Sequence, residues 1–282
     1  MRAEERGVSR RTFLATAGVA VAGLEIARLP GNVAQAADAL PLPALPWPYP
    51  GRGLDVEKLR KAAYTNHKTI YPGCGFCTSQ TLVQAIGDAL AAEGAASNPW
   101  RLLPSGLYKF ANGGVLGWGT ICGAPNGAIA VMTLLGKQNV VGEALLDYFS
   151  TAALPTSALV GWTPPGATTP LKAIPATVSN SPLCHISAST WAAAAGVAIS
   201  DPLKAERCVR LVADVVAKSA ELLNLSFSNG SVPAWKAPPS YAECYSCHTT
   251  AGMVPSEQGK MDCMECHDAV PSHSYRRKRN GR

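Results

Sequence analysis

Two short motifs near the carboxyl end carry the residue types best suited to chemistry. Residues 244–248 and 263–267 both read C-x-x-C-H. Two thiols three positions apart can each form a thioether with one vinyl group of a haem, and the imidazole that follows can bind the iron. The motifs therefore predict covalent attachment of two c-type haems. The haem-binding cysteines are Cys244, Cys247, Cys263 and Cys266, and the proximal iron ligands are His248 and His267.

The same four cysteines have a second interpretation. Two C-x-x-C pairs separated by 15 residues also have the spacing of a zinc ribbon, which would make the chain a non-redox interaction module. A zinc ribbon does not require a histidine directly after each pair, and the chain has only five histidines. The two adjacent histidines therefore favour haem attachment over zinc.

Distal iron ligands must come from elsewhere in the chain, because two haems with two imidazoles each need four histidines. The candidates are His185, His273 and His67, although each could equally be a surface or hydrogen-bonded histidine. Methionine sulfur is an alternative axial donor. Full axial ligation predicts outer-sphere electron transfer, whereas an open sixth position would predict a multihaem reductase of a small anion. The alternative donors are Met253, Met261 and Met264.

Five further cysteines form a separate group, and their odd number argues against complete disulfide pairing. Three of them lie near predicted helix starts, where the helix dipole favours a thiolate. Such thiolates suit an anionic iron–sulfur cluster, with a fourth ligand from the side of a helix. Buried free cysteines, disulfides, or a redox or zinc-binding C-x-x-C pair are alternatives that the spacing leaves open. The five residues are Cys74, Cys77, Cys122, Cys184 and Cys208.

The elements that must position these side chains are predicted to be mainly helical. Helices are expected over residues 55–64, 78–92, 128–135 and 142–149. Two more should begin at Ser181-Pro182 and at Asp201-Pro202, the second running to about Leu223, because a capping side chain followed by proline is typical of a helix start. No sustained β alternation is present, so the fold class is mainly α, with Gly- and Pro-rich loops at 113–119 and 154–175.

The last of these helices is predicted to be amphipathic. Its apolar face carries Cys208, Leu211, Val212, Val215 and Val216, and its polar face carries Arg207, Arg210, Asp214, Lys218 and Glu221.

The amino-terminal segment reads as a signal for export. Residues 9–14 contain paired arginines of the twin-arginine type, an apolar run follows, and Ala34-Gln35-Ala36 offers a cleavage site. The run is shorter than the roughly 20 residues that span a bilayer, so we expect no transmembrane segment in the mature chain. These features predict a periplasmic protein. The expected organisation is 1–36 signal peptide, 37–53 Pro-rich arm, 54–236 helical iron–sulfur domain and 237–282 dihaem segment with a basic tail.

The distribution of charge excludes one class of function. The net charge is +6, but the tail from Arg276 to Arg282 supplies five of the basic residues and the signal segment a net +2. The remaining chain has 15 basic and 16 acidic residues, whereas a nucleic-acid-binding domain presents a basic face. No catalytic triad, phosphate loop or paired carboxylates are visible. We therefore expect no nucleic acid and favour an electron carrier over an enzyme.

One stretch and its context resemble a known family. Residues 113–128 contain Cys122-Gly-Ala-Pro-Asn-Gly127, which is similar to the redox-active proteins with a Cys-Gly-Ala-x-x-Gly motif and four characteristic cysteines. Together with Ser181-Pro-Leu-Cys184-His185 and the two C-x-x-C-H motifs, the chain resembles the split-Soret cytochromes c from about residue 60 to 270.

The resemblance implies a homodimer that exchanges electrons with redox partner proteins, two closely spaced bis-histidine haems in each subunit, and an additional iron–sulfur centre, which we expect to be a 2Fe–2S cluster. Carried over, its ligands are Cys122, Cys184, Cys208 and one residue of the first cysteine pair. Cys77 is favoured over Cys74 because a predicted helix follows it directly. Gly123 and Gly127 would let the backbone pass close to the cluster.

Overall fold

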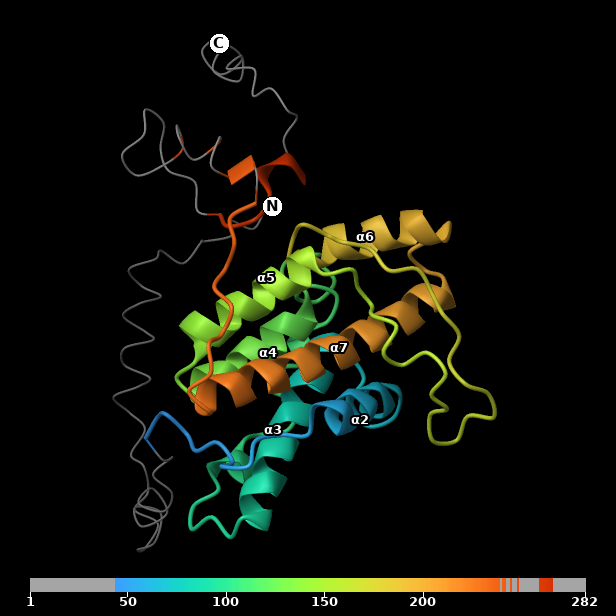
Figure 1. Cartoon of the computed structure of the whole chain (residues 1–282). Helices are drawn as coiled ribbons and strands as arrows, with labels where there is room; N and C mark the ends of the chain where they lie inside the picture. The colour runs from blue at the N-terminus through green and yellow to red at the C-terminus, as the bar shows by residue number, and fades with distance from the viewer. Residues whose placement is uncertain (1–43, 239, 242–243, 245–247, 249–258, 266–282) are drawn as a thin grey trace, which may run out of the picture. The chain divides into compact units, whose positions relative to one another are not determined.

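The computed structural model describes residues 44–238, 240–241, 244, 248 and 259–265 (Figure 1). The described residues are helical, with two isolated β-bridges, Ile121 to Leu183 and Leu154 to Thr177, and no longer strand among them. The prediction of a mainly α fold is therefore confirmed. No helix in the described part of the chain is both long and apolar enough to cross a membrane. The predicted signal peptide lies outside the described residues.

The described part of the chain contains six α-helices, and the longest of them, α7 (Pro202–Phe227), lies at the centre of the fold. The other five are α2 (Val56–Lys68), α3 (Cys74–Ala92), α4 (Gly123–Leu134), α5 (Glu143–Thr151) and α6 (Cys184–Ala195). Short helical turns are η1 (Pro99–Leu102), η2 (Lys109–Ala111), η3 (Gln138–Gly142) and η4 (Cys263–Glu265). Helix α7 contacts α2, α3, α4 and α5, and Figure 1 shows it running alongside α4 and α5.

Local sequence explains where several helices begin. The carboxylate of Asp55 accepts a hydrogen bond from the backbone N–H of Lys58 (2.9 Å) and caps α2. The carboxylate of Asp201 accepts one from Leu203 N–H (2.7 Å), and Pro202 occupies the first helical position, as predicted for α7.

Two helix starts differ from the prediction. Helix α3 begins at Cys74, four residues earlier than expected, so both cysteines of the first pair are helical. Helix α6 begins at Cys184 instead of at Ser181-Pro182, because the Pro182 carbonyl accepts a hydrogen bond from Cys122 N–H (2.9 Å) and this segment pairs with the loop before α4. Both changes place a cysteine at the first residue of a helix.

The predicted polar face of α7 is not a solvent-exposed face. Arg207, Arg210 and Asp214 are buried, with 2–4% of their surface exposed. Helix α2 and the loop after α5 cover Asp214, which pairs with Arg60 and accepts hydrogen bonds from Thr156. Arg207 donates to Ser187 on α6, and Arg210 donates to the Lys172 carbonyl. The expectation of a simple polar face was wrong here. Partners of opposite charge, Glu206 and Arg60, compensate the buried charges of Arg210 and Asp214, whereas the described residues offer Arg207 no such partner.

Glycines allow α3 and α4 to cross at very short distance. A Cβ on Gly123 would lie 1.7 Å from the Ala111 carbonyl oxygen, and one on Gly127 would lie 2.4 Å from the Gly75 carbonyl oxygen. These glycines therefore do permit a close backbone approach, and the partner in the structure is the backbone of α3 and η2. The contact brings the start of α4 against the start of α3.

The described part of the Pro-rich arm lies on the helical domain. Trp47 is buried, donates its backbone N–H to the Leu134 carbonyl (2.8 Å) and stacks edge-on against Trp100. The hydroxyl of Tyr49 donates to the side chain of Asn224 at 2.7 Å. The arm therefore adds to the domain core instead of extending freely.

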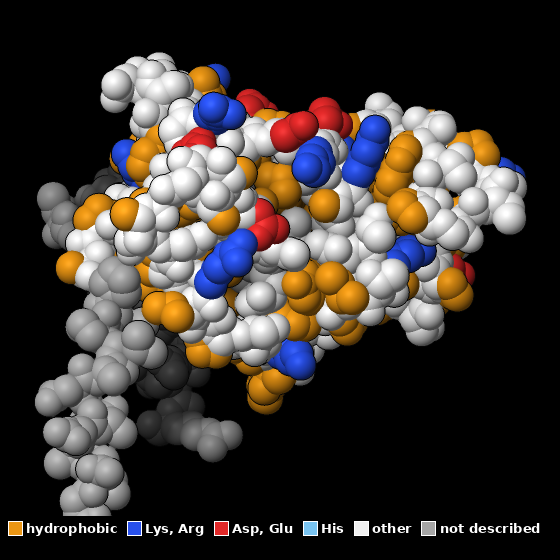
Figure 2. All heavy atoms as spheres, turned by 90° about the horizontal axis from the view of Figure 1, so that it is seen from below, with side chains coloured by type: hydrophobic (Ala, Val, Ile, Leu, Met, Phe, Trp, Pro, Cys, Tyr) orange, Lys and Arg blue, Asp and Glu red, His pale blue; other side chains and the backbone are white. Residues whose placement is uncertain are grey.

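The surface of the domain carries charges of both signs. Figure 2 shows basic and acidic side chains close together on one face, separated by apolar and neutral side chains. Such a mixed surface agrees with the near-neutral balance of the chain between its two ends and gives this face no extended basic region.

Candidate cofactor sites

Three cysteines meet where three helices begin. Cys74 and Cys184 are the first residues of α3 and α6, and Cys122 is the N-cap of α4. The Cys122 thiol is within hydrogen-bonding reach of both other thiols and is fully surrounded by protein. Helix N-termini carry partial positive charge and unpaired N–H groups, so this thiol cluster (Cys74, Cys122 and Cys184) is placed where negative charge is favoured.

A short β-bridge fixes the relation between two members of the thiol cluster. Cys122 N–H donates to the Pro182 carbonyl (2.9 Å), and Cys184 N–H donates to the Thr120 carbonyl (2.7 Å). The bridge pairs Ile121 with Leu183, so each cysteine directly follows one bridge residue. Two segments about 60 residues apart therefore present their thiols side by side.

The surroundings of Cys122 and Cys184 raise the pKa of both thiols. Contact with Cys122, burial and the charge of that neighbour raise the pKa of Cys184, while Lys204 and Arg207 act in the opposite direction. The contact with Cys184 lowers the pKa of Cys122, but the contact with Cys74 and burial outweigh it and raise that pKa. Binding a metal would displace these protons, because thiolates are the ligands.

The thiol cluster is not yet arranged around a common point. Among the described residues, no three or more His, Cys, Asp or Glu side chains form a group ready to hold a metal ion. The cluster consists of two pairwise contacts that share Cys122. Side-chain rotation would have to turn the three thiols toward one iron centre, while the helix starts that carry them are already together.

Cys77 does not join the thiol cluster. Its thiol is buried and donates to the Ala63 carbonyl on α2 at 3.3 Å, and burial raises its pKa to about 12. The preference for Cys77 over Cys74 as a cluster ligand stays a prediction, but the thiol of the first pair that contacts Cys122 is that of Cys74. The preference assumed that the helix starts after Cys77, whereas α3 already starts at Cys74.

Cys208 lies on α7 next to the charges that act on Cys184. Lys204, one helical turn before it, and Arg207, its neighbour, both lie close enough to lower the pKa of the Cys184 thiol. The side chain of Cys208 is half-buried and packs against the core. The structure thus places Cys208 near the thiol cluster, although no direct contact to its sulfur is present.

The haem segment is described in part. His248 N–H donates to the Cys244 carbonyl at 3.0 Å, and Nδ1 of His248 is buried without a partner among the described residues. The thiols of Cys244 and Cys263 contact each other, which brings the two attachment motifs together. Cys247, Cys266, His267 and His273 lie outside the described residues.

Residues just before the second motif attach this segment to the helical domain. Lys260 forms an ion pair with Glu143 at the start of α5. The hydroxyl of Ser181 donates to the Met261 sulfur (3.4 Å), and Asp262 N–H donates to the Asn180 carbonyl (3.4 Å). The second motif therefore begins beside the segment that leads into Cys184.

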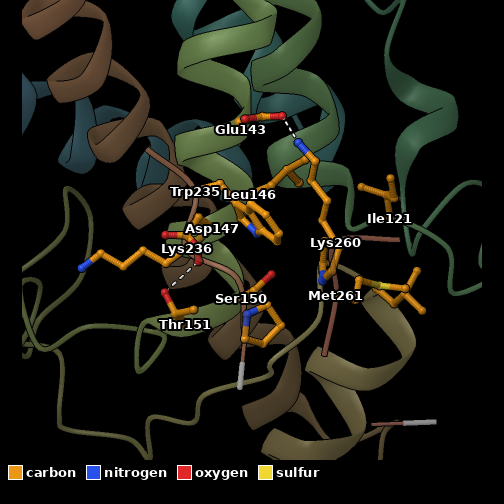
Figure 3. Close-up of a pocket in the computed structure, with 13 residues that line it drawn as sticks. Ile121, Glu143, Leu146, Asp147, Ser150, Thr151, Trp235, Lys236, Lys260 and Met261 are labelled. Atoms are coloured by element: carbon orange, nitrogen blue, oxygen red, sulfur yellow. Dashed lines mark hydrogen bonds and ion pairs between the residues drawn. The ribbon is translucent and has the colours of Figure 1, made fainter. Parts of the chain in front are cut away.

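A pocket of about 310 Å³ lies at this junction (Figure 3). Apolar side chains from α5, from the Ile121–Leu183 bridge and from residues on either side of the first C-x-x-C-H motif line most of it. Glu143, Asp147, Lys236 and Lys260 supply charges. Figure 3 shows the Lys260–Glu143 ion pair at one side, with Met261 and Ile121 on the flank of Lys260. The apolar lining comprises Ile121, Leu146, Pro182, Leu183, Trp235, Pro238 and Met261.

The two described candidates for distal ligands have different surroundings. His185 is exposed, directly follows Cys184, and has its backbone N–H bonded to the Gly119 carbonyl at 3.1 Å. His67 lies in the last turn of α2 with Nε2 buried and without a partner among the described residues, and burial lowers its pKa. His185 therefore follows, by four residues, the Ser181 that contacts the haem segment, whereas His67 lies at the α2–α7 contact.

Sequence reasoning missed two polar side chains near the thiol cluster. Nε of Arg207 and Oγ1 of Thr78 are buried without a hydrogen-bond partner in the described structure. Thr78 lies one helical turn after Cys74. The spacing of Thr78 from Cys74 could have identified Thr78 from the sequence. The burial of Arg207 could not be predicted, because the sequence pattern of α7 assigns Arg207 to the polar face of that helix.

Comparisons with known proteins identify the family of the chain. No family model matches the chain. The split-Soret cytochrome c of Desulfovibrio desulfuricans is 30% identical over 224 residues, which are 77% of this chain and 76% of that protein. The solved structure of split-Soret cytochrome c from strain ATCC 27774, described as containing a novel iron centre, superposes with a TM-score of 0.64 at 28% identity, covering 80% of this chain and 91% of the other. With sequence identity, fold and haem-attachment motifs in agreement, the chain belongs to the split-Soret cytochrome c family.

Proposed function

We propose that this protein is an exported dihaem c-type cytochrome that transfers electrons as a homodimer and carries an additional iron–sulfur cluster. The observation that carries the proposal is its family membership, at 30% identity over 77% of the chain, combined with two C-x-x-C-H motifs. As a member of this family it is a cytochrome c, and its general function is electron transfer. The number of haems, the cluster, the dimer and the twin-arginine route are parts of the proposal.

Thioether bonds from Cys244, Cys247, Cys263 and Cys266 would hold the two haems, with His248 and His267 as proximal ligands. Bound haem would supply one-electron chemistry. The hydrogen bond from His248 N–H to the Cys244 carbonyl suits this role, as does the buried Nδ1 of His248, which has no partner among the described residues. The contact between Cys244 and Cys263 supports close spacing of the two haems. Met261 is two residues before Cys263, so the apolar pocket lies within reach of the second haem.

The iron–sulfur cluster would be held by Cys74, Cys122 and Cys184, with Cys208 as the fourth candidate. Convergence of three helix N-termini supports this ligand set, since their dipoles stabilise anionic thiolates. The relative with a described novel iron centre supports it independently. A 2Fe–2S type is our expectation for the cluster. Cys77 is not included, because its thiol is bonded to α2.

The Gly-rich loop before Cys122 supports a dimer. Leu116 and Trp118 are 72% and 83% exposed, and two such large apolar side chains in one loop are typical of an interaction surface. Their loop also leads to Cys122 and contacts His185 through Gly119. A second copy on this surface would lie close to both cofactor regions.

Absorption spectra and EPR of the mature protein test the proposal. We expect a Soret band, a mass increase equal to two haems, low-spin haem signals that cyanide and nitrite leave unchanged, and a reduced cluster signal with matching non-haem iron and sulfide. A colourless protein with bound zinc would exclude it in favour of an interaction module. High-spin haem that binds nitrite would instead support a reductase.

A further inference from the structure

One buried positive charge lies beside the thiol cluster without a counter-charge. Arg207 on α7 is 2% exposed, and no Asp or Glu of the described chain forms an ion pair with it. Its Nη2 donates to the hydroxyl of Ser187 at 2.6 Å, and its Nε has no partner among the described residues. A buried, unpaired charge is strongly destabilising, so a fold that retains one needs an anion nearby.

The guanidinium of Arg207 lies at the start of α6, where a nearby anion would be especially stabilising. Ser187, its hydrogen-bond partner, lies in the first turn of α6, three residues after Cys184. The start of a helix carries partial positive charge, which repels a guanidinium unless negative charge lies between them. Lys204 lies one helical turn before Arg207 on α7 and adds a second positive charge to this part of the helix. The start of α6 and the basic side chains of α7 therefore both make this site electropositive.

A second unpartnered group borders the same place. Oγ1 of Thr78 is fully buried and unbonded in the described structure, one helical turn after Cys74. Hydroxyl and guanidinium N–H groups are donors that sulfur atoms of an anionic cluster accept from. Two buried donors without a partner among the described residues therefore lie near the thiol cluster, Thr78 one turn after Cys74 and Arg207 bonded to the first turn of the helix that Cys184 begins.

We propose that Arg207 is the counter-charge of the iron–sulfur cluster, with Nε donating to a thiolate or sulfide and Ser187 holding the guanidinium in place. The inference rests on the proposed cluster and adds how the protein sets its reduction potential. Reduction adds one negative charge, which a fixed positive charge favours, so Arg207 raises the potential. Because the group is buried, the effect should depend little on salt.

Arg210 provides a matched control. It is equally buried on the same helix, but it pairs with the Glu206 carboxylate (2.9 Å) and donates to the Lys172 carbonyl (2.6 Å), so its charge is already compensated. Arg207→Gln removes the charge beside the thiol cluster and keeps an amide for Ser187. Arg207→Lys keeps the charge, and Ser187→Ala releases the guanidinium without changing any charge.

The test is a potentiometric titration of the holoprotein, followed by EPR for the cluster and by absorption for the haems. We expect Arg207→Gln to lower the one-electron equilibrium constant of cluster reduction at least tenfold, which is 59 mV. Arg207→Lys and Arg210→Gln should shift it less than half as far, and the haem potentials should stay unchanged. Loss of the cluster in Arg207→Gln alone, with both haems retained, would also support the proposal.

The proposal is overturned if the cluster potential in Arg207→Gln equals that of the unmodified protein, or if the haem potentials move in its place. If Arg207→Gln does not fold, Ser187→Ala decides: a lowered cluster potential supports the role, and an unchanged one excludes it. Absence of non-haem iron in the unmodified protein would be a separate result, because it would refute the proposed cluster itself.

Discussion

The thiol of Cys74 contacts the thiol of Cys122, so the first residue of α3 and the N-cap of α4 form one end of the thiol cluster. We therefore predict that Cys74→Ser removes the iron–sulfur cluster or reduces its occupancy at least tenfold, because a ligand is lost. Non-haem iron, acid-labile sulfide and the EPR signal measure occupancy, and the Soret absorbance confirms that the haems remain.

Cys77→Ser is the matched control, three residues further along the same helix. Its thiol bonds to the Ala63 carbonyl, and a serine hydroxyl can donate to the same oxygen. We expect cluster content to stay within a factor of two. If Cys74→Ser kept a normal content of iron–sulfur cluster and Cys77→Ser lost it, Cys77 would be the cluster ligand in place of Cys74.

His185 is the described histidine best placed to serve as a distal haem ligand, because the bridge residue Leu183 and the neighbouring Pro182 line the pocket at the haem segment. His185→Ala should convert one of the two haems from low-spin to high-spin. Magnetic circular dichroism or EPR gives the number of low-spin and high-spin haems. His67→Ala serves as the comparison and should leave both haems low-spin, since His67 is buried at the α2–α7 contact. An unchanged spectrum in His185→Ala would remove it from the ligand set.

Gly123 sets the distance between α4 and η2. An added Cβ would lie 1.7 Å from the Ala111 carbonyl oxygen, and this backbone atom cannot move aside easily. Gly123→Ala should therefore destabilise the protein by about 3 kcal/mol or more and displace Cys122 from Cys74. Denaturant unfolding measures the loss. Gly142→Ala is the control: φ is −66° and its nearest neighbour is the Ile129 side chain at 3.4 Å, so the change should be within about 1 kcal/mol. If Gly123→Ala and Gly142→Ala were equally stable, the close approach of α4 to the Ala111 backbone would be contradicted.

Glu206 should contribute to stability at neutral pH and lose that contribution in acid. Burial raises the pKa of this carboxyl, but hydrogen bonds from Lys68, Arg210 and Tyr64 outweigh it and hold the pKa below its ordinary value. A depressed folded-state pKa stabilises the fold above the unfolded-state pKa, about 4.3 for Glu, and this stabilisation disappears as pH falls through the folded-state pKa.

Glu206→Gln should therefore cost about 1 kcal/mol at pH 7 and progressively less below about pH 4. Thermal unfolding of both proteins between pH 3 and 8 gives the difference. Glu221→Gln, which removes a more exposed ion pair with Lys218, should show little loss at any pH. If the stability lost in Glu206→Gln increased as the pH fell, the folded-state pKa of Glu206 would be raised and not lowered, and the prediction would be wrong.

Trp118 should contribute to the proposed dimer interface, because its side chain is 83% exposed beside Leu116. We predict that Trp118→Ser weakens self-association at least tenfold, measured by sedimentation velocity over a concentration series. Val140→Ser, at an exposed apolar residue in η3, should leave association unchanged. A monomeric unmodified protein would refute the dimer, and an equally stable Trp118→Ser dimer would place the interface elsewhere.

Several features could be predicted from local patterns because their causes are local. The haem motifs rely on spacings within five residues, and the start of α7 depends on Asp201 and Pro202, which act within one helical turn. The tendency of Cys122 and Cys184 to lie at helix starts was visible for the same reason. The residue at which α6 begins could not be predicted in this way. The Pro182 carbonyl accepts a hydrogen bond from Cys122 N–H, and Cys122 lies about 60 residues away in the chain.

The sequence by itself determined the helical class, the haem-attachment motifs and the family resemblance. Only the tertiary structure decided that Cys74 and not Cys77 contacts Cys122, and that Arg207 is buried instead of exposed. Cys74 and Cys77 are one turn apart on the same helix, so spacing cannot distinguish them. The crossing of α4 at Gly75 and the covering of α7 by distant segments make the choice, since both depend on contacts between residues far apart in the chain.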